Sequence, residues 1–158
     1  VPQSQILLFP RYGMDVVVAH PPEFPLAPEI VARAEARAQE AGASLSFTQD
    51  MDEAVRDADV IYPKNWGGFA HFQPFEDTEA TWQAMQDNLA KHQDWILDAR
   101  RFALAKNDCK IMHALPADRN NEITDEVLDG PNSIIYDEAE NRLHTAKGLL
   151  NLLVGGAA

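Results

Sequence analysis

Side chains capable of chemistry follow four of the segments that the sequence predicts as strands. They occur in the stretches HPPEFPLAP (20–28), KNWGGFAHF (64–72), HALPADR (113–119) and DEAENR (137–142). In parallel sheets, ligands bind outside the carboxyl ends of the strands, so a histidine, a lysine, a tryptophan and an arginine would meet at one rim. Each alone is more often a helix cap, a core histidine or a solvated charge. Their joint placement is therefore what indicates a site.

The stretch IMHALPADR (111–119) begins as a strand and then places His113, Leu115 and Pro116 in succession. A tight turn alone would be served by Gly, Asn or Asp. The proline also removes a backbone donor and restricts the residue before it. This turn therefore needs a reason beyond reversing the chain.

Apolar runs that alternate with helix-periodic segments predict the elements that position these residues. Continuous apolar runs are typical of strands covered on both faces, and an N-terminal proline or a capping residue marks the start of a helix. The predicted class is α/β, a doubly wound, Rossmann-like parallel sheet with helices on both faces. The expected strands are 14–20, 44–48, 59–63, 110–115 and 133–137, and the expected helices are 28–42, 50–58, 79–92, 124–130 and 138–154.

Composition argues against several partners. The formal net charge of -12 disfavours nucleic acid, because binding to phosphates is driven largely by Lys and Arg. Cys109 is the only cysteine, so no intrachain disulfide can form and a cytoplasmic protein is expected. No apolar run approaches the roughly 20 residues that cross a bilayer, so no membrane partner is predicted.

Several familiar catalytic centres lack their motifs. No G-x-G-x-x-G follows a strand and no G-x-x-x-x-G-K-[ST] occurs, so no nucleotide cofactor is expected. The five histidines show neither H-x-H nor H-E-x-x-H spacing, which makes a metal site improbable. There is no G-x-S-x-G nucleophile elbow. The sequence thus predicts no metal, no cofactor and no covalent nucleophile.

Three motifs, in this order, resemble one known family. The stretches MHALPADR (112–119), ITDEVLDGP (123–131) and SIIYDEAENRLHTAKGLLNLL (133–153) are similar to the second-substrate domain of the aspartate/ornithine carbamoyltransferases, with its H-x-L-P turn and its E-N-R. The stretch VPQSQILLFPRYGMDVVVAHP (1–21) resembles the first helix and strand of that domain. The resemblance therefore covers essentially all 158 residues.

The resemblance implies transfer of a carbamoyl group from carbamoyl phosphate to an amine, with release of phosphate. The Leu-Pro bond is typically cis in this family, which would turn the Leu115 carbonyl toward the carbamoyl nitrogen, and a cis X-Pro bond costs only about 0.5 to 1 kcal/mol. Arg142 would polarise or hold carbamoyl phosphate, a task suited to a permanently charged forked donor. The implied catalytic residues are His113, Leu115 and Arg142, and the implied substrate-binding residues are Lys64, Asn65, Trp66, Ala114, Pro116, Asp118, Arg119 and Glu140.

The stretch YPKNWGGFAHF (62–72) resembles the K-[S/T/N]-W form of the knotted subgroup, whose members act on N-acetylornithine, N-succinylornithine or less familiar amines. The proline-rich loop 20–28 resembles the loop through which the chain of that subgroup is threaded, although its prolines alone would also suit a stiff surface connection. A trefoil-type knot is therefore expected, with residues 64–116 passing through this loop. Residues 67–72 are expected to form a mobile lid, and the alternative is a plain packed insertion.

Three positions depart from the family pattern. Ala114 stands where most ornithine-type relatives have Cys. Asp118 and Glu122 stand where the acylornithine enzymes have Arg and Lys, so two positive contacts have become negative. A substrate with an extra amine, or with fewer carboxylates, is therefore as compatible with this sequence as an acylornithine.

The family's N-terminal domain, with its S-T-R-T phosphate loop, has no counterpart in the sequence. The resemblance implies that residues 1–158 form the second-substrate domain of a protein about twice as long, which assembles as a homotrimer. Such a domain is expected to lack turnover by itself. The alternative is a standalone binding or scaffold module that keeps the fold without chemistry. Retention of Lys64, His113 and Arg142 favours the enzyme.

Overall fold

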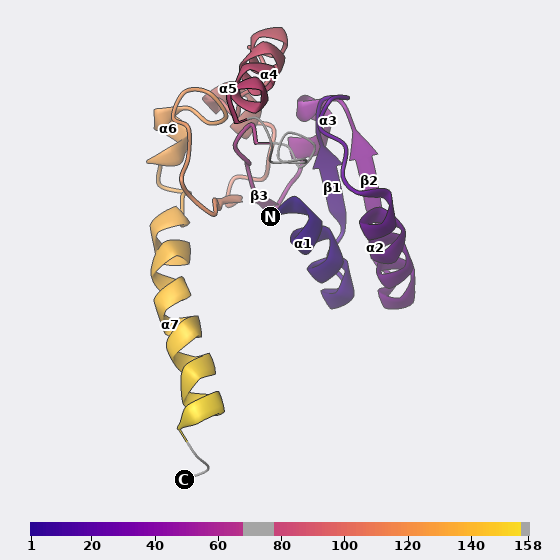
Figure 1. Ribbon diagram of the computed structural model, residues 1–158, viewed down its shortest axis with the longest axis vertical. Helices are drawn as coiled ribbons and strands as arrows, with labels where there is room; N and C mark the ends of the chain where they lie inside the picture. Colours follow the sequence, from indigo (N-terminus) through magenta and orange to yellow (C-terminus); the bar gives the residue numbers. More distant parts are fainter. Residues whose placement is uncertain (68–77, 156–158) are drawn as a thin grey trace.

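A computed structural model describes residues 1–67 and 78–155. Helices and parallel strands alternate along the chain, which confirms the predicted α/β class (Figure 1). The elements are α1 (Pro2–Leu8), η1 (Pro10–Tyr12), β1 (Val16–Ala19), α2 (Pro28–Ala41), β2 (Leu45–Thr48), α3 (Met51–Val55), β3 (Val60–Ile61), α4 (Thr78–Lys91), α5 (Ala99–Phe102), β4 (Lys110–Ile111), α6 (Asp125–Leu128) and α7 (Ile135–Val154).

The strands form two parallel pairs. In β1 and β2, Val16 lies opposite Leu45, and in β3 and β4, Val60 lies opposite Lys110. Within the described residues, no ladder joins the two pairs into one continuous sheet. Four of the predicted strands are confirmed in place, although β3 and β4 are each only two residues long.

The predicted fifth strand at 133–137 is wrong. Ser133 forms a single parallel bridge with Ile111, and the Ile134 amide donates to the Ile111 carbonyl at 2.9 Å. The chain then enters α7 at Ile135, three residues before the predicted helix start. Asp137 and Glu138 lie in the first turn of α7, where acidic side chains stabilise a helix N-terminus. That preference outweighs the apolar, β-branched run that predicted a strand.

Local signals set most of the other helix boundaries correctly. Pro28 occupies the start of α2, and Gly42 ends it at φ 68°, the left-handed conformation that glycine adopts without steric cost. The side chain of Asp50 caps α3 by accepting from the amides of Asp52 and Glu53. The predicted helix at 79–92 is confirmed as α4, with each end shifted by one residue.

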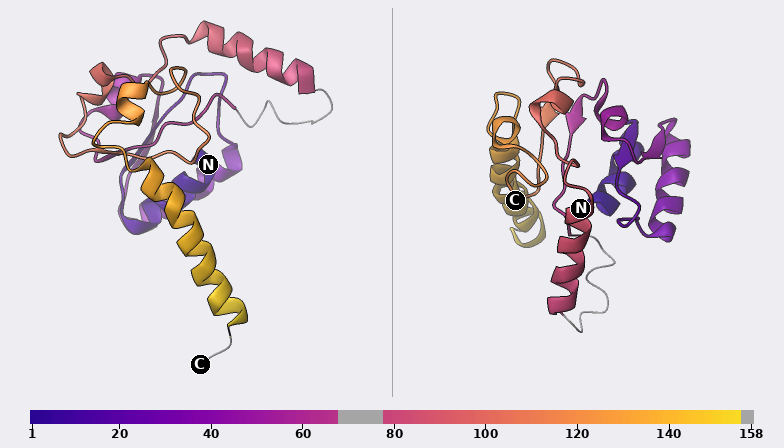
Figure 2. Two further views of the ribbon diagram at one scale, coloured as in Figure 1. Left: turned by 90° about the vertical axis from the view of Figure 1, so that its left-hand side faces the viewer. Right: turned by 90° about the horizontal axis from the view of Figure 1, so that it is seen from above.

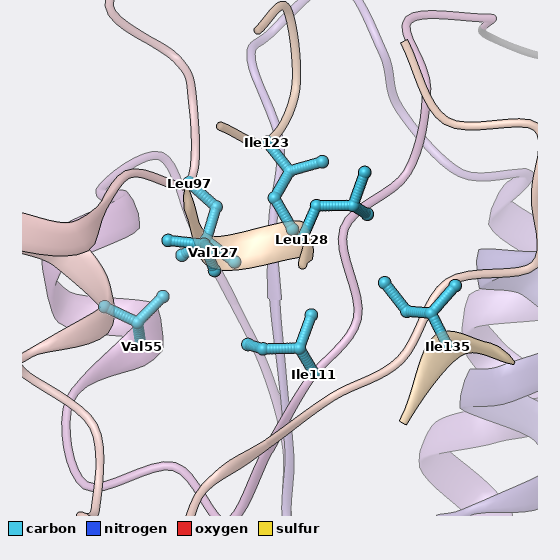
Figure 3. Packing of buried hydrophobic residues seen from close by; sticks show 7 residues of the cluster. All are labelled: Val55, Leu97, Ile111, Ile123, Val127, Leu128 and Ile135. Carbon is cyan, nitrogen blue, oxygen red and sulfur yellow. The ribbon is translucent and has the colours of Figure 1, made fainter. Parts of the chain in front are cut away.

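The hydrophobic core lies between the β3–β4 pair and the helices around it. Figure 3 shows side chains from α3, β4, α6 and the start of α7 gathered at its centre. Ile111 and Ile123 are completely buried. The core anchors β4, so it also fixes the origin of the 113–119 turn. The full cluster is Val55, Leu97, Ile111, Ile123, Val127, Leu128 and Ile135.

Helix α7 extends away from the rest of the molecule, and α4 extends in another direction (Figure 2). Ile135 is the one buried residue among those of α7. The leucines along the helix are more than half exposed, including Leu152 at 83%. In the described chain, no helix is both long and apolar enough to span a bilayer. The exposed large side chains of this apolar stripe are Leu143, Leu149, Leu150, Leu152, Leu153 and Val154.

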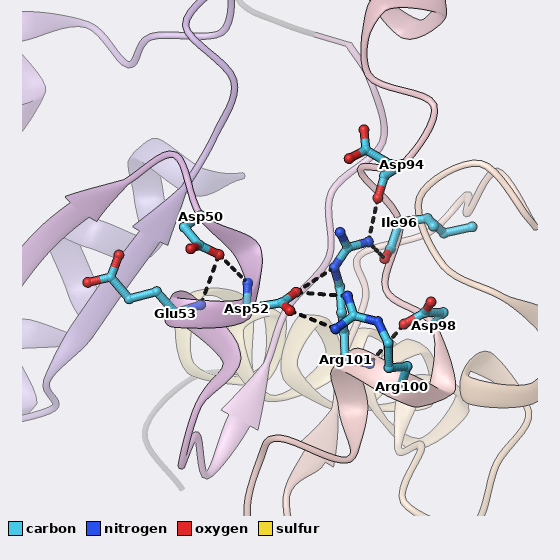
Figure 4. A network of polar contacts seen from close by, with 8 residues as sticks. All are labelled: Asp50, Asp52, Glu53, Asp94, Ile96, Asp98, Arg100 and Arg101. Atoms are coloured by element: carbon cyan, nitrogen blue, oxygen red, sulfur yellow. Dashed lines mark hydrogen bonds and ion pairs between the residues drawn. The ribbon is translucent and has the colours of Figure 1, made fainter.

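Asp52 in α3 is the centre of an ion-pair network with α5 (Figure 4). Its carboxylate accepts from Arg100 at 2.6 and 2.9 Å and from Arg101 at 2.9 Å. Arg101 also donates to the backbone carbonyls of Asp94 and Ile96. Hydrogen bonds from Arg100, and then from Arg101, hold the pKa of Asp52 far below its usual value. The network therefore joins α3 to the segment that leads into α5.

Substitution of Asp52 by asparagine should flatten the acid limb of the stability curve. A depressed carboxyl pKa stabilises the folded state at pH values above the unfolded pKa of 3.8, and that contribution is lost as pH falls through the folded pKa. Below about pH 4, Asp52→Asn should therefore lose less of its remaining stability than the parent chain. Urea unfolding between pH 2 and pH 7 would measure this, and parallel curves would contradict it.

Two predictions fall on residues outside the described ranges. The expected lid at 67–72 lies almost entirely within 68–77. The expected knot requires the path of residues 64–116 relative to the loop 20–28, and that path runs through the same undescribed residues. Threading of the chain therefore stays a prediction.

Candidate functional site

The H-A-L-P turn begins two residues after β4 ends. The peptide bond between Leu115 and Pro116 is cis, as the resemblance implied. Leu115 has φ 51°, a left-handed conformation that is uncommon for residues with a Cβ. Leu115 and Pro116 are both exposed, whereas His113 is 3% exposed. The turn thus presents its leucine and proline outward and buries its histidine.

His113 forms a buried pair with Glu122. The Leu115 amide donates to His113 Nδ1 at 2.9 Å, so Nδ1 is the unprotonated nitrogen. Nε2 therefore carries the proton and donates to Glu122 Oε1, also at 2.9 Å. The same oxygen accepts from the Asp118 amide at 3.0 Å. Glu122 thus fixes the imidazole tautomer and holds both ends of the turn.

Glu138 of α7 clamps the turn from its other side. Its Oε2 accepts from the His113 amide at 2.9 Å, and its Oε1 accepts from the Tyr62 hydroxyl at 2.5 Å. The rings of Tyr62 and His113 are stacked, with centroids 6.4 Å apart and an interplanar angle of 16°. Burial, and then the contact with Glu138, raise the pKa of Tyr62. One carboxylate therefore joins the chain after β3, the chain after β4 and α7.

Trp66 anchors the K-N-W segment that follows β3. It is 8% exposed, and its Nε1 donates to the Asn121 carbonyl at 3.3 Å, next to Glu122 in the sequence. Its ring is stacked on His92 at 6.2 Å and meets Phe24 edge-on at 5.5 Å. The segment after β3, the end of α4 and the proline-rich loop after β1 therefore converge on one tryptophan.

A cavity of about 530 Å³ lies where these segments meet. It extends from the carboxyl end of β1 to that of β3, the position at which doubly wound proteins bind ligands. The lining combines apolar surface with a cation, an amide and a carboxylate. The lining includes His20, Phe24, Lys64, Asn65, Trp66 and Glu122.

The polar groups of the cavity are incompletely paired. Lys64 is half-buried and donates to its neighbour's carbonyl, Asn65 O, at 3.2 Å. Burial lowers the pKa of Lys64, and the negative charges of Glu122 and Asp118 oppose that shift. Asn65 Oδ1 and Glu122 Oε2 are buried and have no hydrogen-bond partner among the residues that the structure describes. The cavity can therefore accept hydrogen bonds at two buried oxygens and neutralise an anion at one lysine.

The structure brings some of the sequence-predicted residues together. Lys64, Asn65 and Trp66 line the cavity. His113 is hydrogen-bonded to Glu122, which also lines it. Asp118 is exposed, and its backbone amide supports Glu122. Ala114 is partly buried beside His113. The turn and the K-N-W segment thus form one connected site.

The remaining predicted residues lie outside the cavity lining. Arg119 donates to Asp125 at 2.5 Å and to Asp129 at 2.6 and 3.0 Å, which ties it to α6. Glu140 is exposed and makes a 3.4 Å contact with His144 one turn along α7. Arg142 is also exposed, one helical turn after Glu138. Its side chain therefore remains accessible to a ligand that approaches α7 from outside.

Two residues of the site were not predicted from the sequence, and the role of a third was not recognised. Tyr62 and Glu138 were not expected to contribute, although Tyr62 directly follows β3 and Glu138 lies four residues before Arg142, on the same helix face. Glu122 was noted only as a departure from a family pattern. Hydrogen bonds between segments 9 to 76 residues apart in sequence reveal these roles, and no local pattern encodes them.

Comparisons with known proteins agree with this geometry. A family model described as "Aspartate/ornithine carbamoyltransferase, Asp/Orn binding domain" matches residues 1–153. The chain belongs to the aspartate/ornithine carbamoyltransferase family. Ornithine carbamoyltransferase of Methanoculleus marisnigri is 42% identical over 147 residues, which are 92% of this chain and 43% of that protein. The corresponding protein of Pyrococcus horikoshii is 40% identical over 148 residues, again 92% and 43%.

Solved structures of two kinds of carbamoyltransferase share this domain. Acetylornithine transcarbamylase complexed with acetylcitrulline superimposes with a TM-score of 0.83 and 36% identity, over 99% of this chain and 45% of that one. Ornithine carbamoyltransferase from Pyrococcus furiosus gives 0.84 and 34%, over 100% and 47%. The chain thus spans less than half the length of these carbamoyltransferases. Within its described residues, no cluster of His, Cys, Asp or Glu is arranged to hold a metal ion.

Proposed function

We propose that this chain is the amino-acid-binding domain of a carbamoyltransferase that transfers the carbamoyl group of carbamoyl phosphate to the amine of an ornithine-like substrate. The observation that carries this proposal is the cis H-A-L-P turn, which the His113–Glu122 pair attaches to the wall of a cavity lined by the K-N-W segment. Family membership over residues 1–153 supports the same reaction.

The proposed reaction needs positioning and charge stabilisation more than covalent chemistry. The amine lone pair forms a bond to the carbamoyl carbon, the bond from that carbon to the phosphate oxygen breaks, and the departing phosphate takes up the proton that the amine loses. The carbonyl of Leu115, a residue that is exposed at the turn, accepts from the carbamoyl nitrogen. Arg142 offers a forked cation to the charge that develops on the leaving phosphate. The catalytic contribution of this domain is thus a fixed acceptor and a permanent positive charge.

A second domain, which binds the phosphate of carbamoyl phosphate, completes the proposed enzyme. The curated relatives are more than twice as long as the matched region. The apolar stripe of α7 supports a covering partner, because monomeric proteins rarely expose apolar patches of such extent. We propose that the N-terminal half of the enzyme covers this stripe and that the complete protein is a cytoplasmic homotrimer.

The 158-residue chain alone should give no measurable carbamoyl transfer from carbamoyl phosphate to L-ornithine or Nα-acetyl-L-ornithine. Fusion behind the carbamoyl-phosphate domain of an ornithine carbamoyltransferase should produce the carbamoylated amine. Radiolabelled carbamoyl phosphate with chromatographic detection of the product measures both reactions. The control is the same fusion with Arg142→Ala, which removes the cation proposed to face the phosphate. Robust product from the isolated chain would contradict the need for a second domain, and an inactive, folded fusion would favour the scaffold alternative.

A further inference from the structure

A histidine and a carboxylate form a pair behind one wall of the cavity. His92 Nε2 and Glu23 Oε2 are 2.9 Å apart, which joins the residue after α4 to the proline-rich loop after β1. Within the described chain, neither residue lines the cavity, whereas Phe24, next to Glu23, and Trp66, stacked on His92, both do. The pair therefore lies outside the cavity and supports its wall.

The imidazole of His92 contacts two tryptophans. It is stacked on Trp66, with ring centroids 6.2 Å apart and an interplanar angle of 11°, and it meets Trp95 edge-on at 6.4 Å. Trp66 in turn donates from its Nε1 to the Asn121 carbonyl. Movement of His92 would therefore change the support of Trp66 directly.

Three neighbours of His92 interact more strongly with an imidazolium than with a neutral imidazole. The first is Glu23, whose own backbone amide, and then His92, hold the pKa of its carboxyl below the usual value. The second is the face of Trp66, because an aromatic face attracts a cation. The third is the end of α4, where the His92 amide donates to the Leu89 carbonyl at 3.1 Å and a helix favours positive charge.

The elements around His92 carry charges of both signs. They are Glu23 on the loop after β1, Lys91 and Asp94 on either side of His92, Lys64 on the K-N-W segment, and Glu122 next to the Asn121 carbonyl that Trp66 contacts. Within the described residues, Glu23 is the one that reaches the ring at ion-pair distance. Lys91 is exposed to solvent, which screens its charge.

We propose that the His92–Glu23 pair is a pH-sensitive latch that holds the end of α4 and the K-N-W segment against the proline-rich loop. Protonation of His92 converts a hydrogen bond from a neutral ring into an ion pair and places a cation on the face of Trp66. Histidine ordinarily titrates near pH 6.5, so the added hold is present below about that pH and is lost as the pH rises toward 8. This inference goes beyond the proposed function, because it concerns the support of the cavity wall and not the reaction.

NMR of the isotope-labelled chain between pH 5.5 and pH 8 tests the latch through the indole N–H of Trp66. Hydrogen exchange of this proton, corrected for the intrinsic effect of pH, should be about fivefold slower at pH 5.5 than at pH 8, the ratio expected from one exposed ion pair and one cation–π contact. His92→Phe keeps a ring against Trp66 but cannot be protonated, so the difference should disappear. Glu23→Gln keeps an acceptor without the charge and should reduce the difference to about twofold.

The matched control is His144→Gln. His144 is an exposed histidine on α7 that also contacts a glutamate, Glu140, at 3.4 Å, so its removal should leave the fivefold difference unchanged.

Equal protection of the Trp66 indole at the two pH values would overturn the inference. A difference that persists in folded His92→Phe would do the same, because another group would then be responsible. An undiminished difference in Glu23→Gln, or its loss in His144→Gln, would also contradict the latch. None of these measurements depends on carbamoyl transfer, so the inference and the proposed function can fail separately.

Discussion

Replacement of Ile111 by alanine should lower the free energy of unfolding by about 2 to 5 kcal/mol, the range measured for large-to-small changes in well-packed cores. Ile111 is completely buried and lies at the centre of the core cluster (Figure 3). Its amide donates to the Asn132 carbonyl at 3.1 Å, and its carbonyl accepts from the Ile134 amide at 2.9 Å. These bonds hold the surrounding backbone, so the cavity left by the substitution should collapse only in part.

The matched control is Val60→Ala in the neighbouring strand. Val60 belongs to β3 and lies opposite Lys110, next to Ile111, yet its side chain is 51% exposed. The control should therefore cost less than about 1 kcal/mol, because little apolar surface is lost from the interior. Urea unfolding followed by circular dichroism measures both variants. Similar losses for the two would show that the β3–β4 pair does not contain the main core.

The sequence predicted the α/β class and four of the strands because the signals involved are local. Pro28 and Gly42 delimit α2 through backbone preferences that need no tertiary context. The prediction was wrong at Ile134 and Ile135 because the conformation of this segment depends on tertiary context. Their β-branched side chains favour a strand, but among the described residues this segment pairs with β4 through one bridge, and the acidic first turn of α7 stabilises the helix instead.

The motifs of the candidate site could be predicted from the sequence, but the contacts that join them could not. The H-A-L-P turn, with its cis bond, and the K-N-W segment could be found because a family resemblance marks them. Glu122 and Glu138 could not be assigned, because their partners lie elsewhere in the chain. Glu140 is exposed on α7, whereas Glu138, two residues earlier, accepts from the His113 amide. Helix periodicity alone does not predict which of the two residues faces the turn. Packing between segments that are distant in the sequence determines which residue faces the turn.

Substitution of Glu138 by alanine should unfold the domain more easily and displace the H-A-L-P turn. The Tyr62 hydroxyl and the His113 amide would both lose their acceptor. An unsatisfied buried donor costs about 1 to 3 kcal/mol, and water can reach the half-buried Tyr62 hydroxyl, so the combined loss should be about 2 to 3 kcal/mol. Glu140→Ala, two residues along the same helix, removes an exposed carboxylate with a single 3.4 Å contact and should change stability by less than about 0.5 kcal/mol.

The effect of Glu138→Ala on carbamoyl transfer should exceed its effect on folding. Glu138 holds the backbone of His113, two residues before the Leu115 carbonyl that is proposed to accept from the carbamoyl nitrogen. A displacement of about 1 Å in a positioning group costs on the order of 10²-fold in rate, so kcat/KM of the two-domain fusion should fall by about that factor at temperatures where the variant is fully folded. Tyr62→Phe removes one of the two contacts and leaves the His113 amide bound, so its kcat/KM should fall by much less. Equal losses of activity in the two variants would show that the contact with Tyr62, rather than the hydrogen bond to the His113 amide, positions the turn, and would contradict the proposed role of Glu138.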